Sequence, residues 1–341
     1  MVLVTGGTGL LGSHLLYDLV LSGTKVRAIK RPNSNLLPVK KIFTLYAPGD
    51  SGLFDRIEWV NGDVLDVYSL SEAMDGIEQL YHCATIVSFN LKDRAQMLKT
   101  NIEGTANVMN MALEKGIKKA LHVSSIAALG RYHTKGMITE ENGWKASSLN
   151  SYYSISKYSA EREAWRATEE GLNTIIINPS IIIGPGNWEK SSANMFASAY
   201  KGIKYYASGV CGFVDVRDVS KCMIGLMNIS IANERFIISS ENYSYKDFFD
   251  LAHDFFGTRK PYKQAGPLLS GIAWRLEKLR NGLTGSSSLI TRETVHAAHS
   301  KQFFSNEKIK KTLGIEFIPV GQSINETCAF FLRDHKLLNT N

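Results

Sequence analysis

Cysteine is scarce in this sequence, and its positions form no pattern. The chain of 341 residues has no CxxC pair and no Cys/His ligand spacing; its cysteines are Cys83, Cys211, Cys222 and Cys328. A disulfide framework or a zinc site would show such spacing. We therefore expect reduced thiols, mostly buried, and no metal site.

Long apolar runs, targeting signals and repeats are missing too. No stretch of about 18 apolar residues is available to span a bilayer. The first residues, MVLVTGG, fit a strand and a turn and lack the charged leader and apolar run of a signal peptide. The composition, 44% hydrophobic and 21% charged, is that of a globular protein. We expect a soluble, cytoplasmic protein of one large domain, or one and a half.

Negative charge is in deficit, and the net charge is +7. Residues 259–311 hold eleven Lys/Arg against three Asp/Glu, so the rest of the chain is about neutral. Two interpretations of the amphipathic stretch 267–283 stay open: a helix packed on a core with a solvated basic face, or a contact with an anionic surface or partner. We expect no nucleic-acid partner and no membrane span.

Strand and helix patterns alternate in the first half of the chain. Short runs rich in Val, Ile and Tyr predict strands at 2–6, 25–31, 57–64, 79–85, 119–125 and 173–180. Helical patterns lie between them, several ending at Gly. This alternation predicts an α/β fold: a doubly wound parallel sheet of the Rossmann type with helices on both faces.

The second half is less regular, which favours a smaller, mostly helical domain that would bind the substrate. We expect the main domain at 1–180 plus 213–237, and the smaller domain at 181–212 plus 238–341. One further strand pair is expected from segments 212–216 and 235–239, with residues 213–237 returning to the main sheet.

A glycine-rich turn separates the first strand from the first helix in VLVTGGTGLLGSHLLYDLVLSG, residues 2–23. Gly6 would permit the tight turn, Gly9 would let a pyrophosphate approach, and Gly12 would bring helix and strand together. The helix N-terminus offers N–H groups and a partial positive charge to that anion. This context favours dinucleotide binding over a purely structural turn, with contacts at Gly6, Thr8, Gly9, Leu10, Leu11 and Gly12.

Lys30 and Arg31 end the second predicted strand, where an NAD site normally has a carboxylate for the adenosine ribose. Cations at this position suit a 2′-phosphate, because a guanidinium can form paired bonds with it. The sequence favours NADP(H), with NAD(H) possible. The alternative is that both are solvated charges at a strand end.

Tyr153 and Lys157 stand four residues apart in YYSISKYSAERE, residues 152–163, which has a helical pattern. Residues at this spacing share one face of a helix, about 5–6 Å between Cβ atoms. A nearby ammonium and a nicotinium ring both favour a phenolate and bring a phenol into range for proton transfer. A single YxxxK is common by chance, so its meaning depends on the motifs around it.

Ser124 and Ser125 end the strand predicted in ALHVSSIAALG. Ligands of open parallel sheets bind beyond the carboxyl ends of the strands. A hydroxyl there can donate to a carbonyl oxygen that gains negative charge during hydride transfer. The ordinary alternative for serines at a strand end is a helix or turn cap.

Together these motifs resemble the extended short-chain dehydrogenase/reductase family, within the NAD-dependent epimerase/dehydratase superfamily. The similarity rests on TGGTGLLG, HVSSIAALG and YSISK in this order, and on GDVLD, YHCAT, TNIEGTANVM, NPSIIIGPG, GFVDVRDV and NEKIKKTLGIEF. The chain looks most like the dihydroflavonol-reductase-like carbonyl reductases. The resemblance implies Tyr153 as general acid, Lys157 as the group that lowers its pKa and holds the nicotinamide ribose, and Ser125 as the catalytic hydroxyl.

Further cofactor contacts come only from the resemblance. It implies adenine contacts at Asp63 and Val64, and a pyrophosphate and ribose path along Ala84 and Thr85. It implies a turn beneath the nicotinamide at Pro179 and Ile182, and a structural role for Asn101. Cys83 departs from the family's aliphatic residue and is expected only to pack.

A second departure, at Cys211, bears on the reaction. Nucleotide-sugar epimerases and dehydratases of the family usually have an Arg at this position to hold the substrate's phosphate. We therefore expect an NADPH-dependent oxidoreductase that reduces an aldehyde or ketone to an alcohol. The alternatives are a nucleotide-sugar epimerase/dehydratase, a hydroxysteroid-type dehydrogenase, and a dinucleotide-sensing regulator without turnover.

The substrate itself cannot be named from the sequence. Apolar and aromatic side chains in the loops where the family builds its pocket suggest a largely uncharged substrate, although each could equally pack in a core: Val87, Ser88, Phe89, Tyr132, Trp188, Met195 and Phe196. The family also implies a possible homodimer through the helices around Asn101 and Tyr153.

Overall fold

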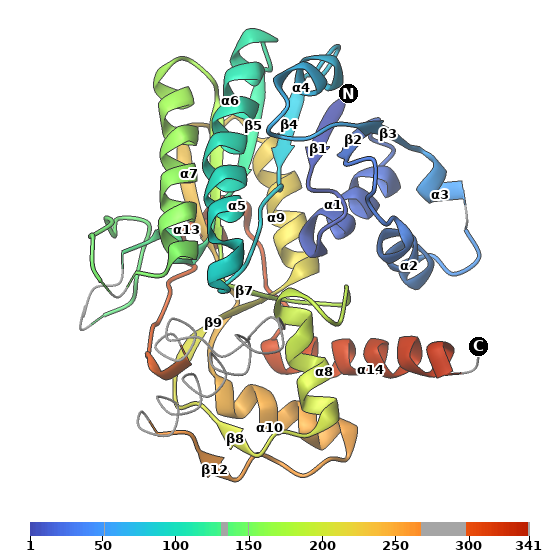
Figure 1. Ribbon diagram of the computed structural model, residues 1–341, viewed down its shortest axis with the longest axis vertical. Coiled ribbons are helices and arrows are strands. Elements are labelled where there is room, and N and C mark those ends of the chain that lie inside the picture. The colour runs from blue at the N-terminus through green and yellow to red at the C-terminus, as the bar shows by residue number, and fades with distance from the viewer. Residues whose placement is uncertain (51, 131–135, 149, 267–297, 340–341) are drawn as a thin grey trace.

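The computed structural model describes residues 1–50, 52–130, 136–148, 150–266 and 298–339. The amphipathic stretch 267–283 and Tyr132 lie outside these residues. A parallel sheet of seven strands forms the body of the molecule (Figure 1), in the order β10-β6-β5-β4-β1-β2-β3. The strands are β1 (Val2–Thr5), β2 (Val26–Lys30), β3 (Ile57–Asn61), β4 (Gln79–His82), β5 (Lys119–Val123), β6 (Thr174–Pro179) and β10 (Glu234–Ile238). The doubly wound fold predicted from the alternating pattern is confirmed, as are its six strands.

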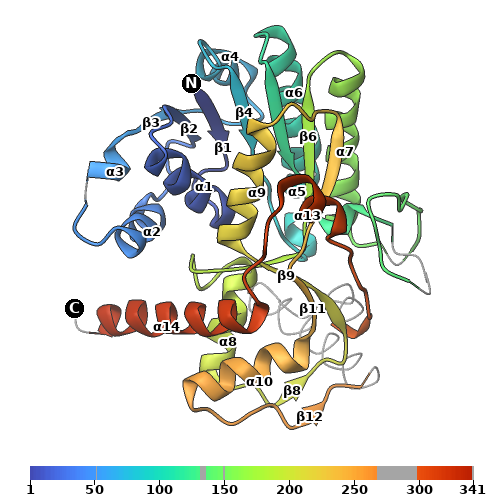
Figure 2. The same ribbon diagram turned by 180° about the vertical axis from the view of Figure 1, so that it is seen from behind.

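Helices cover both faces of this sheet, as the two opposite views show (Figures 1 and 2). One face carries α1 (Leu10–Leu21), α2 (Leu37–Tyr46), α9 (Val216–Asn228) and α13 (Glu307–Leu313). The other carries α4 (Val67–Ala73), α5 (Arg94–Leu98), α6 (Gly104–Glu114) and α7 (Tyr152–Glu169). The remaining short helices are α3 (Gly52–Asp55), η1 (Leu91–Asp93), η2 (Lys99–Glu103), η3 (Ile126–Ala128) and, in the smaller lobe, η4 (Ser191–Ala193).

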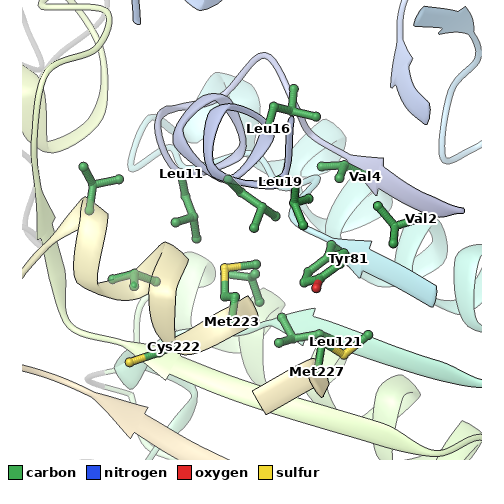
Figure 3. Close-up of a cluster of buried hydrophobic side chains, with 14 of the residues drawn as sticks. Val2, Val4, Leu11, Leu16, Leu19, Tyr81, Leu121, Cys222, Met223 and Met227 are labelled. Carbon is green, nitrogen blue, oxygen red and sulfur yellow. The ribbon is translucent and has the colours of Figure 1, made fainter. Parts of the chain in front are cut away.

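The core divides in two because successive strand residues point to opposite faces. Val2 and Val4 of β1 pack with α1 and α9, whereas Leu3 between them packs with α4, α6 and α7. Figure 3 shows the first cluster, in which side chains of α1 and α9 meet those of the neighbouring strands. The labelled residues are Val2, Val4, Leu11, Leu16, Leu19, Tyr81, Leu121, Cys222, Met223 and Met227.

A smaller lobe lies beyond the carboxyl ends of the main strands (Figures 1 and 2). Its sheet has the order β11-β9-β7, from β7 (Ile181–Ile183), β9 (Val210–Asp215) and β11 (Glu241–Ser244). Its helices are α8 (Asn194–Lys201), α10 (Tyr245–Phe256) and α14 (Val320–Asn339), and a small sheet pairs β8 (Tyr205–Tyr206) with β12 (Lys263–Gln264).

The expected pairing of segments 212–216 and 235–239 is wrong. β9 pairs with β7 and β11 in the small sheet, and β10 alone joins the main sheet beside β6. Both segments are apolar runs of similar length. Such a run predicts a strand, but it does not show which distant strand will pair with it. Only the later part of the segment expected to return, α9 and β10, packs with the main sheet.

Within the described ranges, no helix is both long and apolar enough to cross a membrane.

The turn after β1 is packed so closely that glycine is required at two positions. Gly6 has φ +70°, and a Cβ there would lie 2.5 Å from the Ala84 nitrogen. A Cβ on Gly12 would lie 2.2 Å from the Gly6 carbonyl oxygen. These backbone contacts hold α1 against the turn and the turn against the end of β4.

We predict that Gly12→Ala destabilises the protein by about 1–3 kcal/mol, because the new methyl group collides with backbone that cannot move aside. The midpoint of thermal unfolding measures this loss. Gly143→Ala is the matched control, since a Cβ there meets no described residue within 4 Å. Equal unfolding midpoints for the two variants would contradict the close packing.

Candidate functional site

The expected site residues gather at the carboxyl ends of the central strands. The chain runs from β1 to β2 on one side, whereas β4 lies on the other side of β1. At such a reversal of strand order the flanking loops turn away from each other and leave a crevice where ligands bind. The turn after β1 and the segment after β4 therefore border the expected nucleotide path.

The glycine turn presents backbone groups to this crevice. Gly9 is exposed and precedes α1 as its N-cap residue, without a side chain to cap the helix. The first helical hydrogen bond is donated by Ser13 to the Gly9 carbonyl, so the amides of the residues between them point out of the helix. No acidic residue lies in this first turn. An anion with phosphate geometry fits here.

Leu10 and Leu11 can contribute amides to an anion, but their side chains pack elsewhere. Leu11 is buried in the core cluster under α1, and Leu10 is half-buried beside Gly186 of the loop after β7. Thr8 is half-buried in the turn.

Lys30 and Arg31, expected together at a 2′-phosphate, are placed differently. The Lys30 ammonium donates to the Asn61 side chain at 2.7 Å, across neighbouring strands. Arg31 follows β2 and is exposed. The guanidinium is therefore the better placed of the two cations for a ligand beyond this strand end.

The residues after β3 form a compact turn. The Asp63 carboxylate accepts a hydrogen bond from the Leu65 amide at 3.0 Å, which closes the turn. Val64 is buried, and a Cβ on Gly104 would lie 2.6 Å from its methyl carbon. Asp63 is half-buried at the edge of this turn, and Val64 packs under α6.

Segment 83–86 is fixed by polar side chains beneath it. The Ala84 amide donates to the Thr5 hydroxyl at 3.2 Å, and the Thr85 hydroxyl donates to the Asn101 side chain at 3.1 Å. Asn101 also holds Ile86, accepting from its amide at 2.8 Å and donating to its carbonyl at 3.0 Å. It lies in η2, a π-helical turn, and donates to Ser156 of α7 at 3.0 Å.

A buried histidine, which sequence reasoning missed, completes this support. The Thr5 hydroxyl lies 2.7 Å from His82 Nδ1 and donates to it, because the other ring nitrogen, Nε2, bears the hydrogen. His82 Nε2 then donates to Thr105 at 3.0 Å, and Thr105 donates to the Asn101 carbonyl at 2.6 Å. Burial lowers the pKa of His82 to about 3, so the ring is neutral and its tautomer is set. The sequence did contain a sign of this network: Thr5 and His82 are polar residues at the carboxyl ends of two neighbouring strands.

Tyr153 and Lys157 lie on α7, which begins at an N-cap: the Ser151 hydroxyl accepts from the Ser154 amide at 3.0 Å. Lys157 is 2% exposed, and its ammonium donates to the Val123 carbonyl, the last of β5, at 2.8 Å. Tyr153 is half-buried, and its ring meets that of Phe89 edge-on, with centroids 5.7 Å apart.

The two serines after β5 have separate roles. The Ser125 hydroxyl is hydrogen-bonded to the Tyr153 hydroxyl and also caps η3 by accepting from the Ala127 amide at 3.1 Å. Ser124 is buried and donates to Glu161 at 2.6 Å. The capping alternative therefore holds for Ser125 alongside its contact with Tyr153. Ser124 faces the interior under α7, so a substitution of Ser124 would disturb the core and could not serve as a control for a substitution of Ser125.

Burial acts on the pKa of both α7 groups. It raises the pKa of Tyr153, and the hydrogen bond with Ser125 acts in the opposite direction. It lowers the pKa of Lys157 to about 8, opposed by the Glu161 carboxylate and by Cys83. Burial has the largest effect on the phenol, so the pKa of Tyr153 lies above its ordinary value in the protein alone.

The remaining expected residues flank the site. Pro179 is the buried last residue of β6, and Ile182 is half-buried in β7, packed against the α1 and α9 cluster. Of the proposed pocket side chains, Phe89 contacts Tyr153, whereas Phe196 is fully buried in the core of the small lobe. Trp188 donates from its ring to Asp334 at 2.9 Å.

A dinucleotide fits the residues present. The exposed Gly9 leaves room over the helix N-terminus, where a Cβ would meet only the Gly6 carbonyl oxygen at 3.3 Å. This turn, segment 83–86 and Ser125 follow the carboxyl ends of the neighbouring strands β1, β4 and β5. The site therefore offers an anion cradle at one end and a hydroxyl pair beside a buried cation at the other.

Comparisons with known proteins agree with this geometry. Residues 2–238 match the model of the NAD dependent epimerase/dehydratase family. The chain is 29% identical to "Sterol demethylase protein B" of Methylococcus capsulatus, over 80% of this chain and 79% of that protein. It is 27% identical to "Putative dihydroflavonol 4-reductase" of Synechocystis, over 99% of this chain and 96% of that protein. Other curated relatives in this range of identity are named as reductases.

A solved structure has the same fold over the full length. It is the crystal structure of gox2253, with a TM-score of 0.80, 28% identity, and 98% coverage of each chain. The family model covers the glycine turn, Ser125, Tyr153 and Lys157. The chain therefore belongs to the NAD-dependent epimerase/dehydratase family and is an NAD(P)-dependent oxidoreductase of the extended short-chain dehydrogenase/reductase type.

Proposed function

We propose that the protein reduces an aldehyde or ketone to an alcohol, with NADPH as the preferred cofactor and Ser125, Tyr153 and Lys157 as its catalytic residues. The observation that carries the proposal is the Ser125–Tyr153 hydroxyl pair beside the buried ammonium of Lys157. Relatives named as reductases support the direction of the reaction.

Each group in this site has a distinct part. The reduced nicotinamide, when bound, supplies the hydride. Tyr153 gives its hydroxyl proton to the carbonyl oxygen as that oxygen gains electron density. Ser125 turns its hydroxyl hydrogen to the same oxygen and stabilises the charge that develops there. Lys157, fixed on Val123, holds a positive charge on the face of α7 that carries Tyr153 and so favours the phenolate left behind.

Cofactor contacts follow the crevice from the glycine turn. We assign the pyrophosphate to Gly9 and the first-turn amides of Leu10, Leu11 and Gly12, with Gly6 and Thr8 in the turn beneath. Arg31 is assigned to the 2′-phosphate, with Lys30 as a neighbouring charge. The remaining assigned contacts are Asp63, Val64, Ala84, Thr85, Pro179 and Ile182.

The substrate we propose is largely uncharged. Phe89 lies edge-on to Tyr153, and Val87 nearby in the chain is 46% exposed, so the side chains next to the phenol are apolar. We also propose that the chain divides into the main domain and the smaller domain expected from the sequence, and that the smaller one binds the substrate. A homodimer through α5, α6 and α7 is a further proposal.

A hydroxysteroid-type dehydrogenase is the second candidate, favoured by the relative named sterol demethylase protein B. The same three residues would serve that reaction in reverse, so direction and substrate separate the two. NADP⁺-dependent oxidation of a sterol alcohol, without reduction of simple carbonyls, would favour this candidate. An NAD molecule that copurifies with the protein would instead favour an epimerase.

We predict that Tyr153→Phe lowers kcat for NADPH-dependent carbonyl reduction by about 100-fold or more, because the proton donor is lost while the ring remains. The measurement is NADPH consumption with a panel of uncharged aryl and alkyl aldehydes and ketones. Tyr152→Phe removes a neighbouring hydroxyl, from a ring that stacks under Arg94, and should leave kcat within about twofold. Unchanged reduction by Tyr153→Phe would refute the proton-donor role.

We predict that Arg31→Ala weakens NADPH binding by roughly 10-fold or more and leaves NADH binding unchanged, since a charge-assisted bond contributes about 1.5–3 kcal/mol. Titration of each nucleotide, followed by nicotinamide fluorescence, measures the two dissociation constants. Arg56→Ala is the control: Arg56 is also exposed, but it precedes β3 and so lies at the amino end of the parallel strands, whereas Arg31 lies at their carboxyl end. Equal losses of NADPH and NADH affinity would show that Arg31 does not read the 2′-phosphate.

A further inference from the structure

One carboxylate beneath the site is almost completely buried. Glu161 lies on α7, one helical turn after Lys157, and is 3% exposed. A buried charge is costly unless hydrogen bonds and an opposite charge compensate for the lost water. Its surroundings therefore show what keeps it there.

Four side chains donate to the two oxygens of Glu161. Oε2 accepts from the Ser124 hydroxyl at 2.6 Å and from the Asn178 amide at 2.8 Å. Oε1 accepts from the Arg235 guanidinium at 3.2 Å and from the Trp165 ring at 3.4 Å. Since every partner is a donor, the group acts only as an acceptor, which suits the carboxylate form.

Two of these donors fix the backbone on either side of the Ser125 hydroxyl. Ser124 is the residue before it, and the Asn178 amide also donates to the Ser125 carbonyl at 3.0 Å. The amide orientation of Asn178 is unambiguous, because both of its partners are acceptors. Glu161 thus determines where β5 ends and where the Ser125 hydroxyl meets Tyr153.

The same carboxylate faces Lys157. Residues four apart on a helix share a face, with Cβ atoms about 5–6 Å apart. The other titratable groups that act on Lys157 are His82 and Cys83 at the end of β4 and His122 on β5. Tyr153 lies four residues before Lys157 on α7 and so shares its face of the helix.

These other groups are uncharged near neutral pH. Burial lowers the pKa of His82 to about 3 and that of His122 well below its usual range. It raises the pKa of Cys83 to about 12 and also raises that of Tyr153. Among the described groups that act on Lys157, Glu161 is therefore the one that bears an opposite charge.

We propose that Glu161 is the positioning residue of this site, which holds Ser125 through Ser124 and Asn178 and supplies the negative charge that keeps Lys157 an ammonium. Arg235, from β10, balances the carboxylate and extends the network to the backbone carbonyls of Glu140 and Asn142. The inference rests on the proposed reductase function, in which Lys157 works as a cation.

Glu161→Gln is the direct test, because it removes the charge and keeps the shape. Without the carboxylate the pKa of Lys157 falls further, so the cation is lost at a lower pH. We expect the alkaline limb of the kcat/KM profile to move to lower pH by roughly one unit or more. Activity lost at pH 8 should be largely regained at pH 6, a recovery that a merely misfolded site would not show.

Glu163→Gln is the matched control, since it removes the same charge two residues away, where Glu163 pairs with Arg166 and is 29% exposed. Its alkaline limb should stay with that of the wild type. If Glu161→Gln and Glu163→Gln have the same profile while Tyr153→Phe is inactive, the inference is wrong and the proposed function stands. If Tyr153→Phe remains active, the proposed function itself fails.

Glu161→Gln leaves Arg235 without its buried partner and could prevent folding. The double variant Glu161→Gln/Arg235→Gln removes both charges, and its pH profile is measured if the single variant does not fold. The inference predicts that it shows the same shift of the alkaline limb to lower pH. A double variant that folds with the wild-type limb would overturn the role of Glu161.

Discussion

A lysine ammonium held against a backbone carbonyl is the contact on which the rest of the site depends. Lys157 donates to the carbonyl of Val123, where β5 ends, at 2.8 Å, and it is almost entirely buried. A buried cation needs such acceptors to offset the loss of water. The bond therefore fixes α7 against the carboxyl end of β5. Tyr153, one turn earlier on the helix, is carried to the level of the Ser125 hydroxyl as a consequence.

Polar side chains under the strand ends make this arrangement rigid. Thr5, His82, Thr105 and Asn101 form one chain of hydrogen bonds from segment 83–86 to the π-turn η2, and Asn101 continues it to α7. Such networks are stable only when their members are satisfied, which they are along this chain. Segment 83–86 is thus tied through Asn101 to the helix that bears Tyr153.

Much of the fold could be predicted from the sequence, because the alternation of apolar runs and helical patterns is local. The glycine turn and the Tyr153–Lys157 spacing were visible for the same reason. What could not be predicted depends on partners far apart in the chain. β9 joins the small sheet through β7 and β11, and Arg235 meets Glu161 across 74 residues. The choice of Arg31 over Lys30 depends on which way each side chain points at a strand end.

In the function we propose, the Lys157 ammonium and a bound nicotinium ring together bring the Tyr153 phenol into range for proton transfer near neutral pH. The direct measurement is the ultraviolet difference spectrum of phenolate formation against pH, for the wild type and Tyr153→Phe, each saturated with NADP⁺. We predict one additional phenolate in the wild type, which forms below the ordinary tyrosine pKa of about 10 and is absent from the variant. Superimposable titrations of the two proteins below that pH would contradict it.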